Sequence, residues 1–167
     1  MKHIYLSNPK IENDKYRIRL VRKKDLEQIF ELYSNLDNLK CVNKDDCNLD
    51  DFHYTTMEKV LEKYHFWRCA YKNKWFARFS IISKQENKLI GVLELMKRRS
   101  YDTFDNAIVL RLDLFKEYEK YQVISELLSF IYEKMLKKCS YSKIAVKATL
   151  EMEERVKALI NNKFKLT

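Results

Sequence analysis

The hydrophobic pattern of the first fifty residues changes twice. Residues 16–20 alternate basic and apolar side chains, which predicts a half-buried strand that ends between Leu20 and Arg22. The apolar residues that follow recur at helical spacing and predict one helix face, made by Leu26, Ile29, Phe30 and Tyr33. Residues 34–54 are rich in Asn and Asp and are expected to form a loop with short helical pieces.

A second helix is predicted after this loop. Thr55 and Glu58 match a capping box, in which each side chain satisfies a backbone amide at the helix start. The apolar residues of this helix share one face, formed by Met57, Val60, Leu61 and Tyr64. We expect the helix to end before Asn73.

Three strands are predicted in the middle of the chain. The runs 75–83 and 89–97 flank the polar stretch 84–88, which is typical of a hairpin. The third run, 107–115, alternates strictly. Its apolar residues share one face and its charged residues the other, with Ile108, Leu110, Leu112 and Leu114 opposite Arg111 and Asp113.

The C-terminal part predicts a helix, a strand and a further helix. The first helix starts at Tyr121, ends near Lys137 and Lys138, and buries Val123, Leu127, Ile131 and Met135. A strand over 143–148 follows. Thr149 then caps the last helix, whose buried face is formed by Met152, Val156, Leu159 and Ile160. Residues 164–167 are expected to begin a strand.

The order of elements is therefore β-α-α-β-β-β-α-β-α-(β), without internal repeats or a linker. Antiparallel strands followed by a late βαβ crossover favour an α/β fold with a mixed sheet flanked by helices. The length of 167 residues fits one domain over 1–167.

Composition excludes several classes of protein. The chain has one Gly and one Pro, where average usage gives about 12 and about 8. A glycine-rich phosphate loop is therefore excluded. No apolar run is long enough for a membrane span, and residues 1–10 lack the apolar segment of a signal peptide. We expect a soluble, cytoplasmic protein that contacts no membrane.

The net charge of +9 favours acidic partners. The best local candidate for nucleic acid is the run Lys97-Arg98-Arg99, beside Tyr101 and Phe104. However, Lys greatly outnumbers Arg, and base-reading contacts depend on Arg. A solvated lysine-rich surface is therefore favoured over nucleic-acid binding.

The four cysteines are expected to be free thiols, because none forms a C-x-x-C pair. Cys41, Cys47, His53 and His65 match no usual zinc spacing, so no metal site is predicted. Cys41 or Cys47 as a nucleophile has no partner base that the sequence identifies.

Three short segments carry a resemblance to a known family. They are residues 16–22 followed by 24–27, the run Leu89-Ile90-Gly91-Val92-Leu93, and Ala158-Leu159 with Phe164. Together with the element order over about 15–166, they resemble the GNAT superfamily of N-acetyltransferases, in particular its ribosomal-protein-alanine acetyltransferase branch. The resemblance implies the transfer of an acetyl group from acetyl-CoA to an amine. A protein N-terminus, a polyamine and an antibiotic remain open as acceptors.

The resemblance also implies a pyrophosphate loop before the helix at 121. The family commonly has Arg-Gly-Lys-Gly-Tyr-Ala there, and this chain has Tyr118, Glu119, Lys120, Tyr121, Gln122 and Val123. Both glycines are replaced, and Glu119 puts a carboxylate where the pyrophosphate is expected. Lys120 keeps a cation and Gln122 a polar donor. A helix start can still attract an anion through its backbone amides and dipole.

Other positions depart from the family as well. Ile108 stands where the family often has a Glu that can act as a general base. Met152 and Arg155 stand where the family often has an Asn and a Ser in the last helix. Lys163 replaces the Gly before Phe164. The family's closing hairpin is not present before Thr167, so we expect an exposed sheet edge that a partner subunit, as in a homodimer, could cover.

Glu94 and Asp113 are the candidate bases for accepting the amine's proton. The structural alternative for Glu94 is an ion pair with a cation on a neighbouring strand, such as Arg111. Tyr118, Tyr121 and Tyr132 are candidate acids, although aromatic residues on helices more often serve packing. Three functions remain: an acetyl-CoA-dependent N-acetyltransferase, an inactive protein of the same fold that binds a partner, and a basic nucleic-acid binder.

Overall fold

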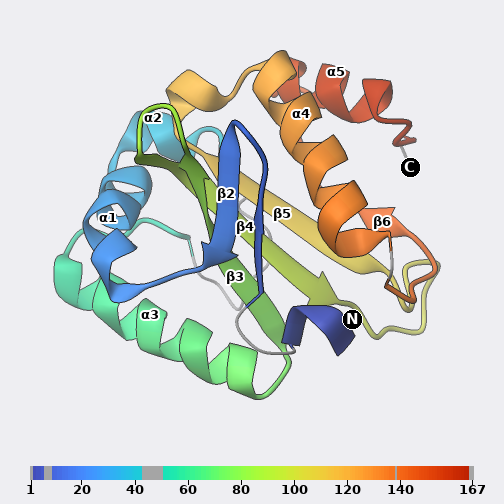
Figure 1. Ribbon diagram of the computed structural model, residues 1–167, viewed down its shortest axis with the longest axis horizontal. Helices are drawn as coiled ribbons and strands as arrows, with labels where there is room; N and C mark the ends of the chain where they lie inside the picture. Colours follow the sequence, from blue (N-terminus) through green and yellow to red (C-terminus); the bar gives the residue numbers. More distant parts are fainter. Residues whose placement is uncertain (1, 6–8, 43–50, 138, 166–167) are drawn as a thin grey trace.

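The computed structural model describes residues 2–5, 9–42, 51–137 and 139–165. Six strands form one sheet, and they lie side by side in the order of the sequence (Figure 1). The strands are β1 (Lys10–Glu12), β2 (Tyr16–Leu20), β3 (Phe76–Ser83), β4 (Lys88–Lys97), β5 (Ile108–Leu114) and β6 (Ile144–Ala145). Neighbours pair antiparallel except β5 and β6, which are parallel. The predicted α/β fold with a mixed sheet is confirmed.

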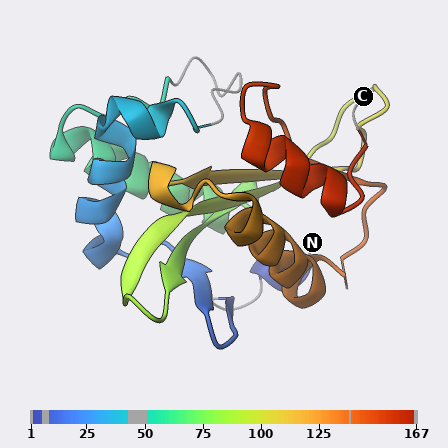
Figure 2. The same ribbon diagram turned by 90° about the horizontal axis from the view of Figure 1, so that it is seen from above.

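The helices form two groups, on the two sides of the sheet. The first group is α1 (Leu26–Ser34), α2 (Leu36–Leu39) and α3 (Met57–Lys72), and the second is α4 (Tyr121–Ile131) and α5 (Glu153–Asn161). Figures 1 and 2 show the groups at opposite ends of the molecule. Short 3-10 turns η1 (Lys2–Tyr5), η2 (Lys23–Asp25) and η3 (Lys116–Tyr118) connect elements, and a π-turn, η4 (Tyr132–Leu136), extends α4. None of the described helices is long and apolar enough to cross a bilayer.

Strand β5 explains why the sheet has two buried faces. Leu110, Leu112 and Leu114 pack in one core with α4 and α5, as the alternation predicts. Arg111 and Asp113 point to the other face, yet they are only 4% and 1% exposed. The second core, which includes α1 and α3, covers this face. The alternation therefore predicts the orientation of these residues but not the burial of the charged ones.

Helix α3 begins one residue later than predicted. The Thr56 side chain, not Thr55, accepts the backbone amide of Lys59 at 3.3 Å. The helix ends at Lys72, as expected. Its buried face is extended by the large side chain of Trp67, which is 5% exposed.

The last helix differs more from its prediction. It starts at Glu153 rather than after a Thr149 cap, and Arg155, Ala158 and Leu159 are its buried residues. Ile160, predicted to be buried, is 55% exposed. The face is rotated because Arg155 turns inward to an ion pair described below. In α4, similarly, Ile124 is buried and Val123 only half-buried.

Two predicted strands are shorter or missing. The strand predicted over 143–148 is reduced to Ile144–Ala145, because its pairing with β5 covers only two residues. Phe164 is not in a strand, and residues 166–167 lie outside the described part of the chain. Strand β1 was not predicted, since three residues give too short a pattern.

Candidate functional site

The segment between β5 and α4 is the candidate cofactor loop. After β5, η3 leads to Lys120, which is extended (φ −123°, ψ 141°) and precedes the first helical residue, Tyr121. The first amides of a helix have no partner within the helix, and the dipole makes this end positive. The structure thus places the start of α4 within residues 118–123, as the sequence predicts, and this end is suited to an anion.

The carboxylate of Glu119, close to this helix start, is paired with a cation. Its two carboxylate oxygens accept hydrogen bonds from Nε and Nη2 of Arg155, both at 2.6 Å. The side chains are 8% and 1% exposed. The two residues that depart from the family pattern, Glu119 and Arg155, therefore bind each other. Arg155 balances the charge that was expected to repel a pyrophosphate.

A second carboxylate reaches the helix start from α5. The backbone amide of Tyr121 donates to Oε2 of Glu154 at 2.8 Å, in an exposed position. The ammonium of Lys157 lies 5.0 Å from the centre of the Tyr121 ring. The first turn of α5 thus supplies the anion that the start of α4 attracts.

Tyr118 ties the loop to the β3–β4 hairpin. Its hydroxyl donates to Oε2 of Glu86 at 2.5 Å. Burial, and then the hydrogen bond to Glu86, raise the pKa of Tyr118 above its ordinary value. This hydroxyl therefore holds its proton firmly, which disfavours the predicted role as a general acid. The other candidate acids lie on helices: Tyr121 is half-buried at the start of α4, and Tyr132 is exposed.

Strands β5 and β6 separate in front of this loop. The described pairing covers Ile108 with Ile144 and Val109 with Ala145 and stops there, while β5 continues to Leu114. Ile108, where the family often has a Glu, is fully buried in the apolar core. This position therefore offers no proton acceptor.

Glu94 and Asp113 lie on the opposite face of the sheet, and each is held by an arginine. Arg78 on β3 donates from Nε to Oε2 of Glu94 at 3.0 Å, and its Nη2 lies 2.7 Å from the same oxygen in an ion pair. Glu94 faces both Arg78 and Arg111 in the strand register, but its partner is Arg78. The ion pair considered for Glu94 thus exists with a different cation.

Asp113 is held by hydrogen bonds on the same face of the sheet. It accepts from Nε of Arg111 at 2.9 Å and from the hydroxyl of Tyr33 at 2.8 Å. Burial, and then the charge of Asp113, raise the pKa of Tyr33 well above its ordinary value. The guanidinium groups also lie over aromatic rings, Arg78 at 4.5 Å from Trp67 and Arg111 at 3.5 Å from Phe52.

Arg78 and Tyr33 are two residues on this side of the sheet that the sequence pattern does not single out. Their signal is weak, because Arg78 is a single charged residue in a mainly apolar strand, and Tyr33 belongs to the predicted apolar helix face. A buried arginine needs a partner, so an isolated cation in such a strand points to a carboxylate on the next strand.

The described residues contain no group of His, Cys, Asp and Glu side chains that could hold a metal ion. Cys47 lies outside the described residues, so the four-residue zinc candidate is not tested as a set. Cys41, Cys69 and Cys139 are free thiols, as expected. Burial, and then nearby Glu119, raise the pKa of Cys41, which disfavours the thiolate a nucleophile needs.

Comparison with solved structures identifies the fold. No protein-family model and no curated protein sequence matches the chain. A ribosomal-protein-alanine acetyltransferase from Vibrio fischeri is similar in structure, with a TM-score of 0.65, 16% identity, and coverage of 92% of this chain and 81% of the other.

Two further acetyltransferases agree with it. A GNAT-family acetyltransferase from Bacillus anthracis has a TM-score of 0.66 and 17% identity, and the match covers 92% and 81% of the two chains. A spermidine N-acetyltransferase from Vibrio cholerae, solved with CoA and spermine, has a TM-score of 0.60 and 17% identity over 89% and 80%. The chain therefore has the fold of the GNAT N-acetyltransferases.

Proposed function

We propose that this chain is an N-acetyltransferase that uses acetyl-CoA and acts on an amine of a protein or a small molecule. The observation that carries the proposal is the shared fold, in which α4 follows β5 through the short turn η3 and begins beside a strand pair that separates. The resemblance to the GNAT family implies that backbone amides at this helix start hold the pyrophosphate of acetyl-CoA. Helix starts bind phosphate groups in this way in many proteins.

The residues at the start of α4 fit a pyrophosphate group once Glu154 moves aside. The bond from Tyr121 to Glu154 is exposed, so an incoming anion can replace this carboxylate at modest cost. The charge of Glu119 is balanced by Arg155. Lys120 and Lys157 are exposed beside this turn and would add positive charge. When bound, acetyl-CoA supplies the activated acetyl group.

Glu94 is the residue we propose to accept the proton of the amine. The hydrogen bond and the ion-pair contact of Arg78 are both to Oε2, and the Glu94 side chain is 14% exposed. Oε1 therefore remains able to accept a proton, directly or through water. Asp113 is buried more deeply and accepts from Arg111 and Tyr33, so we assign it to positioning these two residues.

Calorimetric titration of the protein with acetyl-CoA and with CoA tests the proposal. We expect a dissociation constant on the order of micromolar and a loss of about fivefold in Lys120→Ala, since a charge contact to phosphate contributes roughly 1 kcal/mol. Lys134→Ala is the matched control, because it removes an exposed lysine from η4, beyond the far end of α4. Absence of binding at millimolar acetyl-CoA would contradict the proposal.

One observation favours a second candidate, a protein of this fold that binds a partner without transferring acetyl groups. The buried Glu119–Arg155 pair and the Glu154 contact give the cofactor loop internal partners and make it stable without a ligand. This candidate predicts that neither acetyl-CoA nor CoA raises the melting temperature of the protein.

A further inference from the structure

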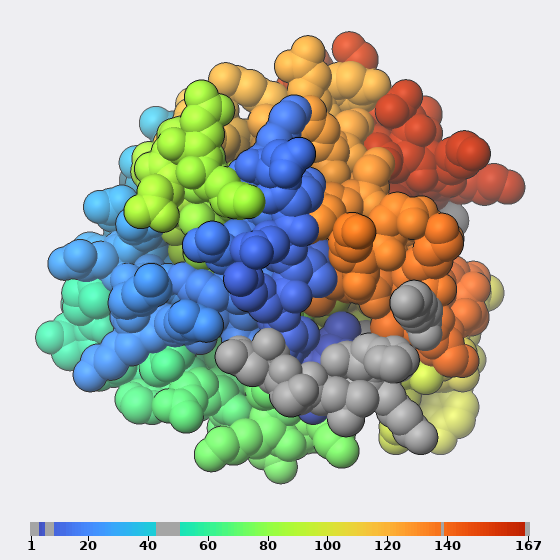
Figure 3. Space-filling model, in the orientation of Figure 1, coloured from blue at the N-terminus to red at the C-terminus, as the bar shows by residue number. Residues whose placement is uncertain are grey.

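A basic pocket of about 270 Å³ lies beside β1 and β2, and none of residues 118–123 of the cofactor loop lines it. Its charged lining consists of five cations and one carboxylate: Lys10, Arg17, Arg19, Arg22, Lys24 and Asp25. The segments that supply them meet on the face shown in Figure 3. We propose that this pocket binds the phosphate group of a small phosphorylated ligand. The proposal does not depend on acetyl transfer.

The carboxylate in the pocket does not oppose an anion, because it is already fully engaged. Arg19, only 4% exposed, donates to both oxygens of Asp25, at 2.6 and 2.7 Å. Asp25 also accepts from the hydroxyl of Ser80 at 2.7 Å and from the amide of Arg22 at 2.8 Å. The floor of the pocket is therefore a rigid, neutral pair, and four further cations surround it.

Two of these cations have weak partners. Nε of Arg17 and Nζ of Lys10 lie 3.0 and 3.1 Å from the carboxylate of Glu12. All three side chains are more than a third exposed, and exposed ion pairs contribute little to stability. A phosphate group with two charges can therefore compete with Glu12 for them.

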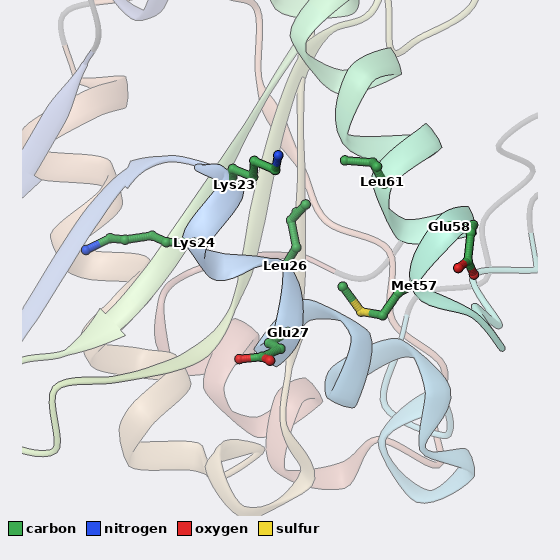
Figure 4. Close-up of a pocket in the computed structure, with 7 residues that line it drawn as sticks. All are labelled: Lys23, Lys24, Leu26, Glu27, Met57, Glu58 and Leu61. Atoms are coloured by element: carbon green, nitrogen blue, oxygen red, sulfur yellow. The ribbon is translucent and has the colours of Figure 1, made fainter.

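The other two cations, Arg22 and Lys24, form no ion pair with any residue that the structure describes. Figure 4 shows that the side chains of Lys23 and Lys24 leave η2 in opposite directions. Lys24 points away from Met57 and Leu61, and of the two lysines it alone lines the basic pocket. Arg22 and Lys24 are therefore available to a ligand.

The neutral residues that line the pocket add a hydrogen-bond donor and an apolar wall to its charged groups. Oε1 of Gln28 accepts the amide of Leu89 at 2.7 Å, so the amide nitrogen of Gln28 is left to donate. Ile82 and Leu89 are buried and give the pocket an apolar wall. Small-molecule sites start at roughly 300 Å³. The volume and the convergence of donors from several elements favour a small ligand over an extended nucleic-acid strand.

Titration with pyrophosphate at constant ionic strength tests this site. We expect Arg22→Ala and Lys24→Ala each to weaken binding about tenfold, because each removes a charged donor from the phosphate. Lys23→Ala is the matched control: it removes the same charge from the adjacent residue of η2, outside the basic pocket, and should change affinity less than about twofold. All three residues are exposed, so the variants are expected to fold.

The outcomes separate the sources of the phosphate. Failure of pyrophosphate to bind, or an equal loss in Lys23→Ala and Lys24→Ala, overturns the proposal, since only general charge attraction would remain. A short single-stranded RNA that binds more tightly than pyrophosphate through Arg22 and Lys24 also overturns it, in favour of nucleic acid. Binding that persists in the presence of saturating CoA supports a separate site and leaves the acetyltransferase proposal unaffected.

Discussion

Glu119 and Arg155 form a bidentate, buried ion pair between the loop two residues before the start of α4 and the first turn of α5. Each charge alone would be costly to bury, because it would lose its hydration without a partner. The adjacent residue, Glu154, binds the amide of Tyr121. Two consecutive residues of α5 thus fix the loop that follows β5.

Removing one member of this pair should destabilise the protein strongly. We expect Arg155→Ala to lower the free energy of unfolding by about 3–5 kcal/mol, because Glu119 would remain buried and unpaired. Urea denaturation measures this. The double variant Glu119→Leu with Arg155→Met should recover most of the loss, since apolar residues of similar volume often replace a buried pair without cost. A double variant as unstable as Arg155→Ala would show that the charge left behind is not the cause.

Gly91→Ala should be destabilising because β4 and β5 approach closely at this residue. A Cβ at position 91 would overlap the carbonyl oxygen of Asp113 and lie 2.6 Å from Cδ2 of Leu114. Since the first contact is to backbone, the strands must shift, and we expect a loss of about 1–3 kcal/mol in thermal or urea unfolding. Lys88→Ala, on the same strand but half-exposed, is the control and should change stability by less than about 0.5 kcal/mol. Equal stability of Gly91→Ala and wild type would mean that the strands yield easily.

The stability of the protein should fall in acid through Asp25. Burial would raise the pKa of Asp25, but hydrogen bonds from Arg19, Ser80 and the amide of Arg22 outweigh it and lower the pKa. A depressed pKa contributes stability above the unfolded value of about 3.9, and this contribution is lost as pH falls through the folded pKa. Unfolding free energies measured from pH 6 down to pH 2 should therefore decrease below about pH 4.

Asp25→Asn should flatten that decrease and lower stability at neutral pH. Asp14→Asn is the matched control, because Asp14 is exposed on the β1–β2 hairpin. An acid profile of Asp25→Asn that parallels wild type would assign the effect to other carboxylates.

The elements that are periodic in sequence were predictable, and the pairing of distant charges was not. Alternation over 107–115 and helical spacing over 26–33 depend on residues a few positions apart, so both could be inferred locally. The partner of Glu119 is 36 residues away, and no local pattern favours Arg155 over the other cations of the chain. The rotated face of α5 follows from the same pair. The position of the candidate loop could therefore be predicted, but its charge balance could not.

Glu154 should compete with acetyl-CoA for the start of α4. Its carboxylate accepts the amide of Tyr121 at 2.8 Å, where the proposed pyrophosphate would bind. Replacing Glu154 leaves this amide free to bind the cofactor and removes one negative charge from the site. Glu154→Ala should therefore tighten acetyl-CoA binding about threefold, or by roughly 0.7 kcal/mol. Glu153→Ala removes the preceding exposed acid of the same turn and should change the affinity much less. Calorimetry on both variants measures the difference. Equal affinities would place the cofactor elsewhere, whereas weaker binding in Glu154→Ala would mean that Glu154 holds the loop in its binding shape.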